Sequence, residues 1–265
     1  MGEGGDSAAG ERAATAVGER ALAGIAIALT AVAGYLDALG WILLSHVYVA
    51  NMSGNTIAVG RGLAEHNLGE ALARIWPIFA FGLGLFVSEL AHELLRRRGR
   101  SSSAGFTLGL EAGAVALVAI LPWPPVQSAT GLAYYLPTGL LALAMGLQNA
   151  TLIRVGASSV YTTHVTGNLT RLVREAAHSV IWVGDRARHL TTGGLFEQRS
   201  TRRVLLMSAI LVAYGTAALL GALAAAAWQG RGGLAAVIAL TALVIVDAFK
   251  PIGGHQPATH PNAMF

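Results

Sequence analysis

The chain has 265 residues, of which 54% are hydrophobic and 12% are charged, with a formal net charge of +4 and no cysteine. A soluble domain carries roughly a quarter charged residues, so this composition indicates an integral membrane protein. Without cysteine, disulfides, thiolate metal sites and cysteine nucleophiles are excluded. No basic run with interleaved aromatics indicates a nucleic-acid partner.

Residues 1–19 are rich in glycine, alanine and glutamate, and we expect them to form a disordered cytoplasmic tail. Six apolar stretches follow, each about long enough to cross the ~30 Å hydrocarbon core as a helix. The stretches are 21–44, 75–95, 104–123, 133–153, 204–228 and 232–250. The sequence therefore predicts an all-α bundle of six membrane spans, followed by a C-terminal tail at 251–265.

Arginines in the connecting segments predict the orientation of these spans. The run RRRGR (96–100), Arg154 and the arginine-rich loop 171–203 are expected in the cytoplasm, whereas the uncharged 121–131 is expected outside. Counting crossings then places both termini in the cytoplasm. It leaves two polar segments, YVANMSGNTIAVG and YTTHVTGNLTRLV, that do not cross and are either re-entrant or interfacial.

The two halves of the chain repeat. AGYLDALG (33–40) aligns with MGLQNATL (145–152), so that Asp37 corresponds to Asn149. VYVANMSGN (47–55) aligns with VYTTHVTGN (160–168), and AFGLGLFVSELA (80–91) resembles AYGTAALLGALA (213–224).

With three spans in each half, the second copy must be inverted relative to the first. We therefore predict a 3+3 inverted repeat made of residues 20–128 and 129–250. Inverted repeats with broken elements near the bilayer midplane recur among transporters.

The segments VAGYLDALGW…VYVANMSGNT and AMGLQNATLIRVG…VYTTHVTGNLTRL resemble the paired signatures of the YoaK-like family of bacterial membrane proteins. The resemblance covers residues 21–250, and Ser53 stands where that family's TGN has threonine, which keeps the hydroxyl. It implies about six spans in a bacterial cell (inner) membrane. The family is a domain of unknown function, so the resemblance supplies no substrate.

Asp37 lies near the middle of the first apolar stretch, where an ionised carboxylate is costly. It is either a proton or cation site or a structural hydrogen-bond acceptor for another helix. In the motifs, Gly54 is expected to permit a turn, and Ser53 or Asn55 to cap the following helix. Thr166 or Asn168 would do the same in the second copy.

A helix N-terminus at membrane depth favours an anion, a carboxylate or a polar solute, although the loops could equally be kinks needed for packing. His164 is either a proton relay or a structural residue. Near the end of the sixth stretch, Asp247 is expected to form a solvated pair with Lys250. The candidate pathway consists of Asp37, Tyr48, Asn51, Ser53, Gly54, Asn55, Gln148, Asn149, Tyr161, His164, Thr166, Gly167 and Asn168, with Glu111 joining the same polar network.

These features favour a small-solute transporter or channel, proton-coupled through Asp37. The alternatives are a non-transporting assembly or regulatory subunit, and a membrane-embedded hydrolase using Asp37, His164 and Ser53. The chain lacks a GxSxG elbow and an HExxH motif, so we expect no enzyme. We expect neither metal nor cofactor, and the expected partners are the lipid bilayer, a small solute and further copies of the chain.

Overall fold

The computed structural model describes residues 4–99, 103–121, 131–150, 153–155, 158–160, 162–188, 194, 198–249 and 252. Within them, the helices are α1 (Gly4–Leu43), α2 (Met52–Ala64), α3 (Leu68–Arg97), α4 (Ala104–Ile120), α5 (Leu132–Asn149), α6 (Val165–Ala187), α7 (Arg199–Trp228) and α8 (Leu234–Phe249). A 3₁₀-helix, η2 (Gln229–Gly233), joins α7 to α8. Two short strands, β1 (Ile153–Val155) and β2 (Ser158–Val160), pair antiparallel.

Each of the six apolar stretches coincides with a helix, namely α1, α3, α4, α5, α7 and α8. Two differences stand out. First, α1 begins at Gly4, so residues 4–19 are helical where we expected disorder, because their alanines, two glutamates and single arginine are good helix formers. Second, α5 ends at Asn149 and a β-hairpin follows, so the fold is helical but not purely α.

Three helical segments are long and apolar enough to cross a membrane: Gly18–Leu43, Leu68–Arg97 and Arg199–Phe249. The last has 51 residues, more than twice the ~20 that one crossing needs, and it turns back at η2. Gln229 has a φ of 51° there, and Gly230, Gly232 and Gly233 are buried in the turn. A shorter apolar helix, Ala104–Ile120, accompanies them. The expected six crossings stay a prediction.

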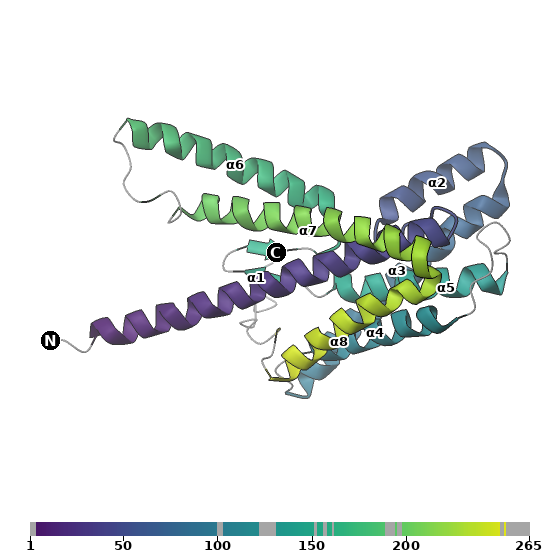
Figure 1. Ribbon diagram of the computed structural model, residues 1–265, viewed down its shortest axis with the longest axis horizontal. Helices are drawn as coiled ribbons and strands as arrows, with labels where there is room; N and C mark the ends of the chain where they lie inside the picture. Colours follow the sequence, from purple (N-terminus) through teal and green to yellow (C-terminus); the bar gives the residue numbers. More distant parts are fainter. Residues whose placement is uncertain are drawn as a thin grey trace, which may run out of the picture.

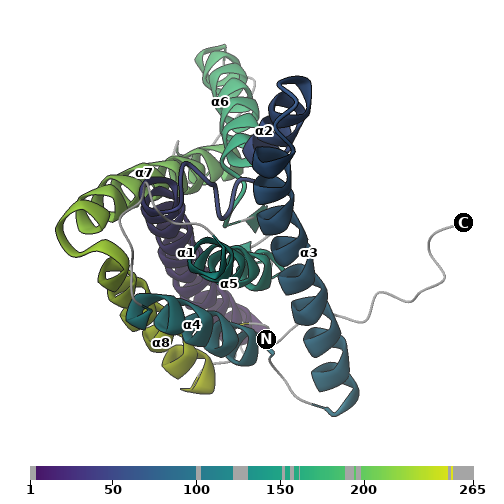
Figure 2. The same cartoon turned by 90° about the vertical axis from the view of Figure 1, so that its right-hand side faces the viewer.

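The helices surround a central pair. Figure 2 shows α1 and α5 in the middle, with α3, α4, α8 and α7 around them and α2 and α6 together on one side. In Figure 1, α2 and α6 lie on that same side and run outward in opposite directions, so their first residues face one another. The main packing partners are α1 with α7, α3 with α5, and α4 with α8, while α2 packs on α3 and α6 packs on α7.

Glycines allow the two main helix pairs to approach closely. A Cβ built on Gly34 of α1 would overlap the carbonyl oxygen of Tyr214 in α7. In the same way, a Cβ on Gly146 of α5 would overlap the carbonyl oxygen of Phe81 in α3. Both crossings therefore depend on a missing side chain, as is common where membrane helices pack without a hydrophobic driving force.

Candidate functional site

The first polar motif is held in place by Asp37. Its Oδ1 accepts hydrogen bonds from the backbone N–H of Val49 at 2.8 Å and of Ala50 at 2.9 Å. Its Oδ2 accepts a hydrogen bond from the Tyr214 hydroxyl at 2.9 Å. The side chain is only 5% exposed. One carboxylate thus closes the loop after α1 back onto its own helix and ties both to α7.

All three of these partners are donors, so both Asp37 oxygens act as acceptors. This arrangement suits an ionised carboxylate, whose cost of burial is offset by hydrogen bonds to its charge. It matches the structural alternative for Asp37.

Asn55 closes the same loop from the other side. Its Nδ2 donates to the carbonyl oxygen of Tyr48 at 2.7 Å, and its Oδ1 accepts from the N–H of Tyr48 at 3.3 Å. The Tyr48 ring covers Gly54, where a Cβ would lie 2.6 Å from the ring carbon Cδ2. Gly54 lies inside α2 and not in a turn. The predicted turn at Gly54 is therefore wrong, and the glycine instead leaves room for the Tyr48 ring.

The helices after the motifs begin earlier than the sequence suggested. The residue that precedes α2 is Asn51, and the residue that precedes α6 is His164. Ser53 lies within the first turn of α2, where its hydroxyl donates to Asn51 Oδ1 at 2.6 Å. Thr166 occupies the equivalent place in α6. The prediction that Ser53 or Asn55, and Thr166 or Asn168, are the capping residues is wrong.

The second motif is held by the end of α5. Thr163 donates through its hydroxyl to Asn149 Oδ1 at 2.5 Å. Gln148 donates through Nε2 to the carbonyl oxygen of Leu29 at 2.9 Å and to the hydroxyl of Thr162 at 3.0 Å. Asp37 and Asn149, which the repeat aligns, therefore do the same task, since each holds the loop that follows its own helix.

Exposure follows the same pattern in the two copies. Asn51 and Ser53 are exposed at the start of α2, and His164 and Thr166 are exposed at the start of α6. Asn55 and Asn168 are both buried, at 1% exposure. Gly167 is exposed as well, whereas Tyr161 lies outside the described residues.

The hydrogen bonds of Asp37 and Asn55 lie within the first motif and its helices, and those of Gln148 and Asn149 hold the second, so the candidate residues form two clusters. Glu111 belongs to neither of them. It is fully buried in α4, and neither of its carboxylate oxygens has a hydrogen-bond partner among the described residues.

Sequence reasoning missed one residue in these contacts, Tyr214 of α7. Tyr214 sits in a repeat segment that the alignment identified, but its role depends on the packing of α7 against α1. Asp247 is 8% exposed and accepts hydrogen bonds from the N–H of Gly105 at 2.8 Å and of Ile252 at 2.6 Å. Asp247 therefore caps the start of α4, whereas we expected a solvated pair with Lys250, which lies outside the described residues. No group of three or more histidines, aspartates or glutamates suited to a metal occurs in the described part.

The long apolar helices define a helical membrane protein. The chain belongs to the family described as "Protein of unknown function (DUF1275)", whose family model matches residues 25–247. It is similar to the UPF0700 transmembrane protein YoaK of Bacillus subtilis (strain 168), with 24% identity over 147 residues. That match spans 54% of this chain and 62% of the relative. No solved structure matches the chain. The resemblance inferred from the two motifs is confirmed.

Proposed function

We propose that the chain is a small-solute transporter or channel, with its polar pathway between two motif elements that belong to an inverted repeat. The observation that carries the proposal is the matched construction of the motifs. In each copy, a polar side chain on one helix, the buried Asp37 or the half-buried Asn149, holds the loop from which the next helix starts.

The helix packing supports the inverted repeat. The order α1–α4 would be one half and α5–α8 the other. The aligned residues Gly34 and Gly146 occupy equivalent crossings, the first against Tyr214 and the second against Phe81, which are themselves aligned. In this arrangement α1, α3, α4, α5, α7 and α8 cross the inner membrane. Both termini lie in the cytoplasm, and α2 and α6 start at the two motifs without crossing.

The start of α2 and the start of α6 face one another from opposite directions (Figure 1). Exposed polar side chains gather at these starts, among them Ser53 and Thr166. At membrane depth, polar side chains and non-helical backbone are tolerated where they line water or are covered by protein. A water-filled pathway between the two starts satisfies that requirement, and the positive ends of both helix dipoles would favour polar or anionic solutes.

Proton coupling through Asp37 receives less support than the pathway itself. Its oxygens accept hydrogen bonds from three protein donors, which supports a structural role for this side chain. In the proposed transporter, Asp37 holds the first motif in the conformation that the pathway needs.

The absence of cysteine makes a labelling experiment direct. Single cysteines at Ser53 and Thr166 would be introduced into the full chain in liposomes, with Leu219→Cys on the 62%-exposed, apolar face of α7 as the matched control. We expect a charged, water-soluble thiol reagent to modify the two motif positions but not Leu219→Cys. Modification should block efflux of at least one solute from a panel of glycerol, urea, alanine and acetate. Efflux indistinguishable from empty liposomes for all four, or efflux unaffected by modification, would contradict the proposal.

The contacts also bear on the two alternatives. Stable co-purification of one partner protein, together with no efflux, would favour a non-transporting assembly or regulatory subunit. A hydrolase would need Ser53 beside a base. The Ser53 hydroxyl instead donates to Asn51, and Asp37 is occupied by two main-chain N–H groups and Tyr214.

A further inference from the structure

An open cavity of about 350 Å³ lies at the end of the molecule where α1 ends and where α3 and α5 begin. Ser45 lines it from the loop after α1, and Glu70, Ala73 and Arg74 line it from α3. Gly131, Tyr134 and Tyr135 line it from the start of α5. We call it the Arg74 cavity. It is separate from the two motifs and lies on the side of the membrane that the charge pattern predicts to be external.

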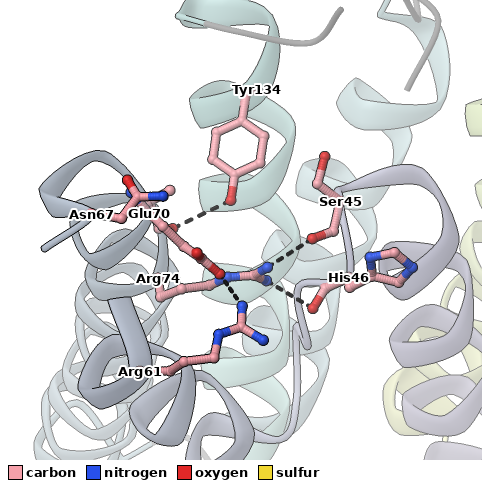
Figure 3. Close-up of polar contacts among 8 residues, drawn as sticks. Ser45, His46, Arg61, Asn67, Glu70, Arg74 and Tyr134 are labelled. Carbon is pink, nitrogen blue, oxygen red and sulfur yellow. Dashed lines mark hydrogen bonds and ion pairs between the residues drawn. The ribbon is translucent and has the colours of Figure 1, made fainter. Parts of the chain in front are cut away.

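Arg74 and Glu70 are the two charged residues that line this cavity (Figure 3). Arg74 is 9% exposed. Its guanidinium donates to the carbonyl oxygen of His46 at 2.7 Å and to that of Ser45 at 2.9 Å. Ser45 and His46 have φ angles of 52° and 62°, in the left-handed region, so Arg74 holds a tight turn after α1.

Both acceptors of Arg74 are neutral. The carboxylate of Glu70 lines the same cavity, but its Oε1 is engaged by the guanidinium of Arg61 (Figure 3). Arg74 itself takes part in no ion pair within the described residues. Burying a cation without a paired anion is unfavourable, so an anionic group in the cavity would gain more here than in water.

The rest of the cavity wall favours an organic anion over a simple inorganic one. Two tyrosine rings border it, with centroids 5.1 Å apart, and the Trp76 ring lies edge-on to Tyr135 at 6.3 Å. Trp76 also donates to the carbonyl oxygen of Tyr135 at 2.7 Å, which fixes this aromatic wall. The N-terminal end of α5 lines the cavity as well, and its dipole adds positive potential.

We propose that the Arg74 cavity binds a small organic carboxylate, with the carboxylate on Arg74 and the apolar part against the tyrosine rings. The inference does not depend on transport through the motifs, because it concerns binding in the Arg74 cavity. Ser45 also lines the cavity, and in the proposed complex its hydroxyl is a second donor for the carboxylate.

The test is thermal stabilisation of the full chain in detergent by four probes: benzoate, benzamide, benzylamine and inorganic phosphate. Benzamide has the shape of benzoate without its charge, benzylamine carries the opposite charge, and phosphate has charge without the apolar part. We expect a saturable rise in the unfolding temperature with benzoate alone. Equal stabilisation by benzamide or by phosphate, or no stabilisation by benzoate, would overturn the proposal.

Two variants locate the site. Arg74→Lys keeps the charge but loses the planar fork of donors, and we expect benzoate to bind at least about tenfold more weakly. Because Arg74 also holds the loop, Ala73→Leu is the second variant: it fills the cavity without altering Arg74, and we expect it to abolish the benzoate effect. Ala226→Leu, at an exposed position of α7, is the matched control and should bind as the wild type does. Unchanged benzoate binding by Ala73→Leu would place the ligand elsewhere and refute the assignment.

Discussion

Replacing Asp37 is the sharpest test of how the first motif is held. Asp37→Ala removes the acceptor for two buried N–H groups, those of Val49 and Ala50, and the partner of the Tyr214 hydroxyl. A buried donor left without an acceptor costs about 1–3 kcal/mol, so the two N–H groups together should cost roughly 2–6 kcal/mol of the free energy of unfolding. The hydroxyl adds less, because it can rotate toward another acceptor.

The graded variants Asp37→Asn and Tyr214→Phe separate the parts of this cost. Asparagine keeps an acceptor oxygen for the loop but loses the charge that strengthens the hydrogen bonds, so we expect a loss of about 1–2 kcal/mol. Tyr214→Phe leaves both loop N–H groups bonded and should cost about 1–2 kcal/mol, since one carboxylate oxygen loses its donor. Asp37→Ala should therefore be clearly the least stable of the three.

Unfolding of the full chain by sodium dodecyl sulfate in mixed micelles, followed by tryptophan fluorescence, measures these differences. Trp41 reports on the loop because its ring centroid lies 4.5 Å from that of Tyr48. Hydrogen exchange at Val49 and Ala50 should accelerate in Asp37→Ala. The exposed Glu89→Ala is the control for losing a carboxylate without a buried role. If Asp37→Ala unfolds within about 1 kcal/mol of the wild type, or Asp37→Asn is as unstable as Asp37→Ala, the assigned role is wrong.

Gly34→Ala should destabilise by about 1–3 kcal/mol in the same titration, because its methyl group would meet the backbone of α7; wild-type stability would contradict the close crossing. Gly215→Ala is the matched control, since a Cβ there meets nothing within 4 Å, and it should stabilise by up to about 1 kcal/mol. Asp247→Ala should cost about 0.5–2 kcal/mol through the lost cap of α4, with faster hydrogen exchange at the start of that helix, and unchanged exchange would refute the cap. Gln148→Leu, which installs the residue found at the aligned position of the first half, should cost about 1–3 kcal/mol and loosen the second motif without accelerating exchange in the first. Accelerated exchange in both motifs would mean that they are coupled.

The apolar stretches predicted the helices well because a run of about 20 apolar residues has few stable alternatives to a helix in this composition. The alignment of Asp37 with Asn149 also identified two residues with equivalent contacts. The hydrogen-bond partners of these two residues could not be predicted from the sequence. Tyr214 is 177 positions away from Asp37, and only the packing of α1 on α7 brings them together.

Predictions from local sequence were also wrong where a tertiary contact decides the conformation. Gly54 suggested a turn, but the Tyr48 ring requires a glycine within the helix. The aligned segments 33–40 and 145–152 also differ in where their helices end. The helix α1 extends beyond Asp37 to Leu43, whereas α5 ends at Asn149. Arg74 precedes a predicted span and carried no motif, so its burial followed only from the structure. The signal that could have indicated it is the position of Arg74 directly before the apolar stretch 75–95.

The glycine-mediated crossings group the helices differently from the two halves of the sequence repeat. The backbones of α1 and α7 are in contact, as are those of α3 and α5, and each of these pairs takes one helix from each half of the chain. Because α6 packs on α7 and α2 packs on α3, each pair also carries the helix that follows one of the two motifs. The tightly coupled units are therefore α1–α6–α7 and α2–α3–α5. Each motif joins the two units, because Asp37 of α1 holds the loop before α2 and Asn149 of α5 holds the loop before α6. A rearrangement that separates the units would therefore have to break these hydrogen bonds.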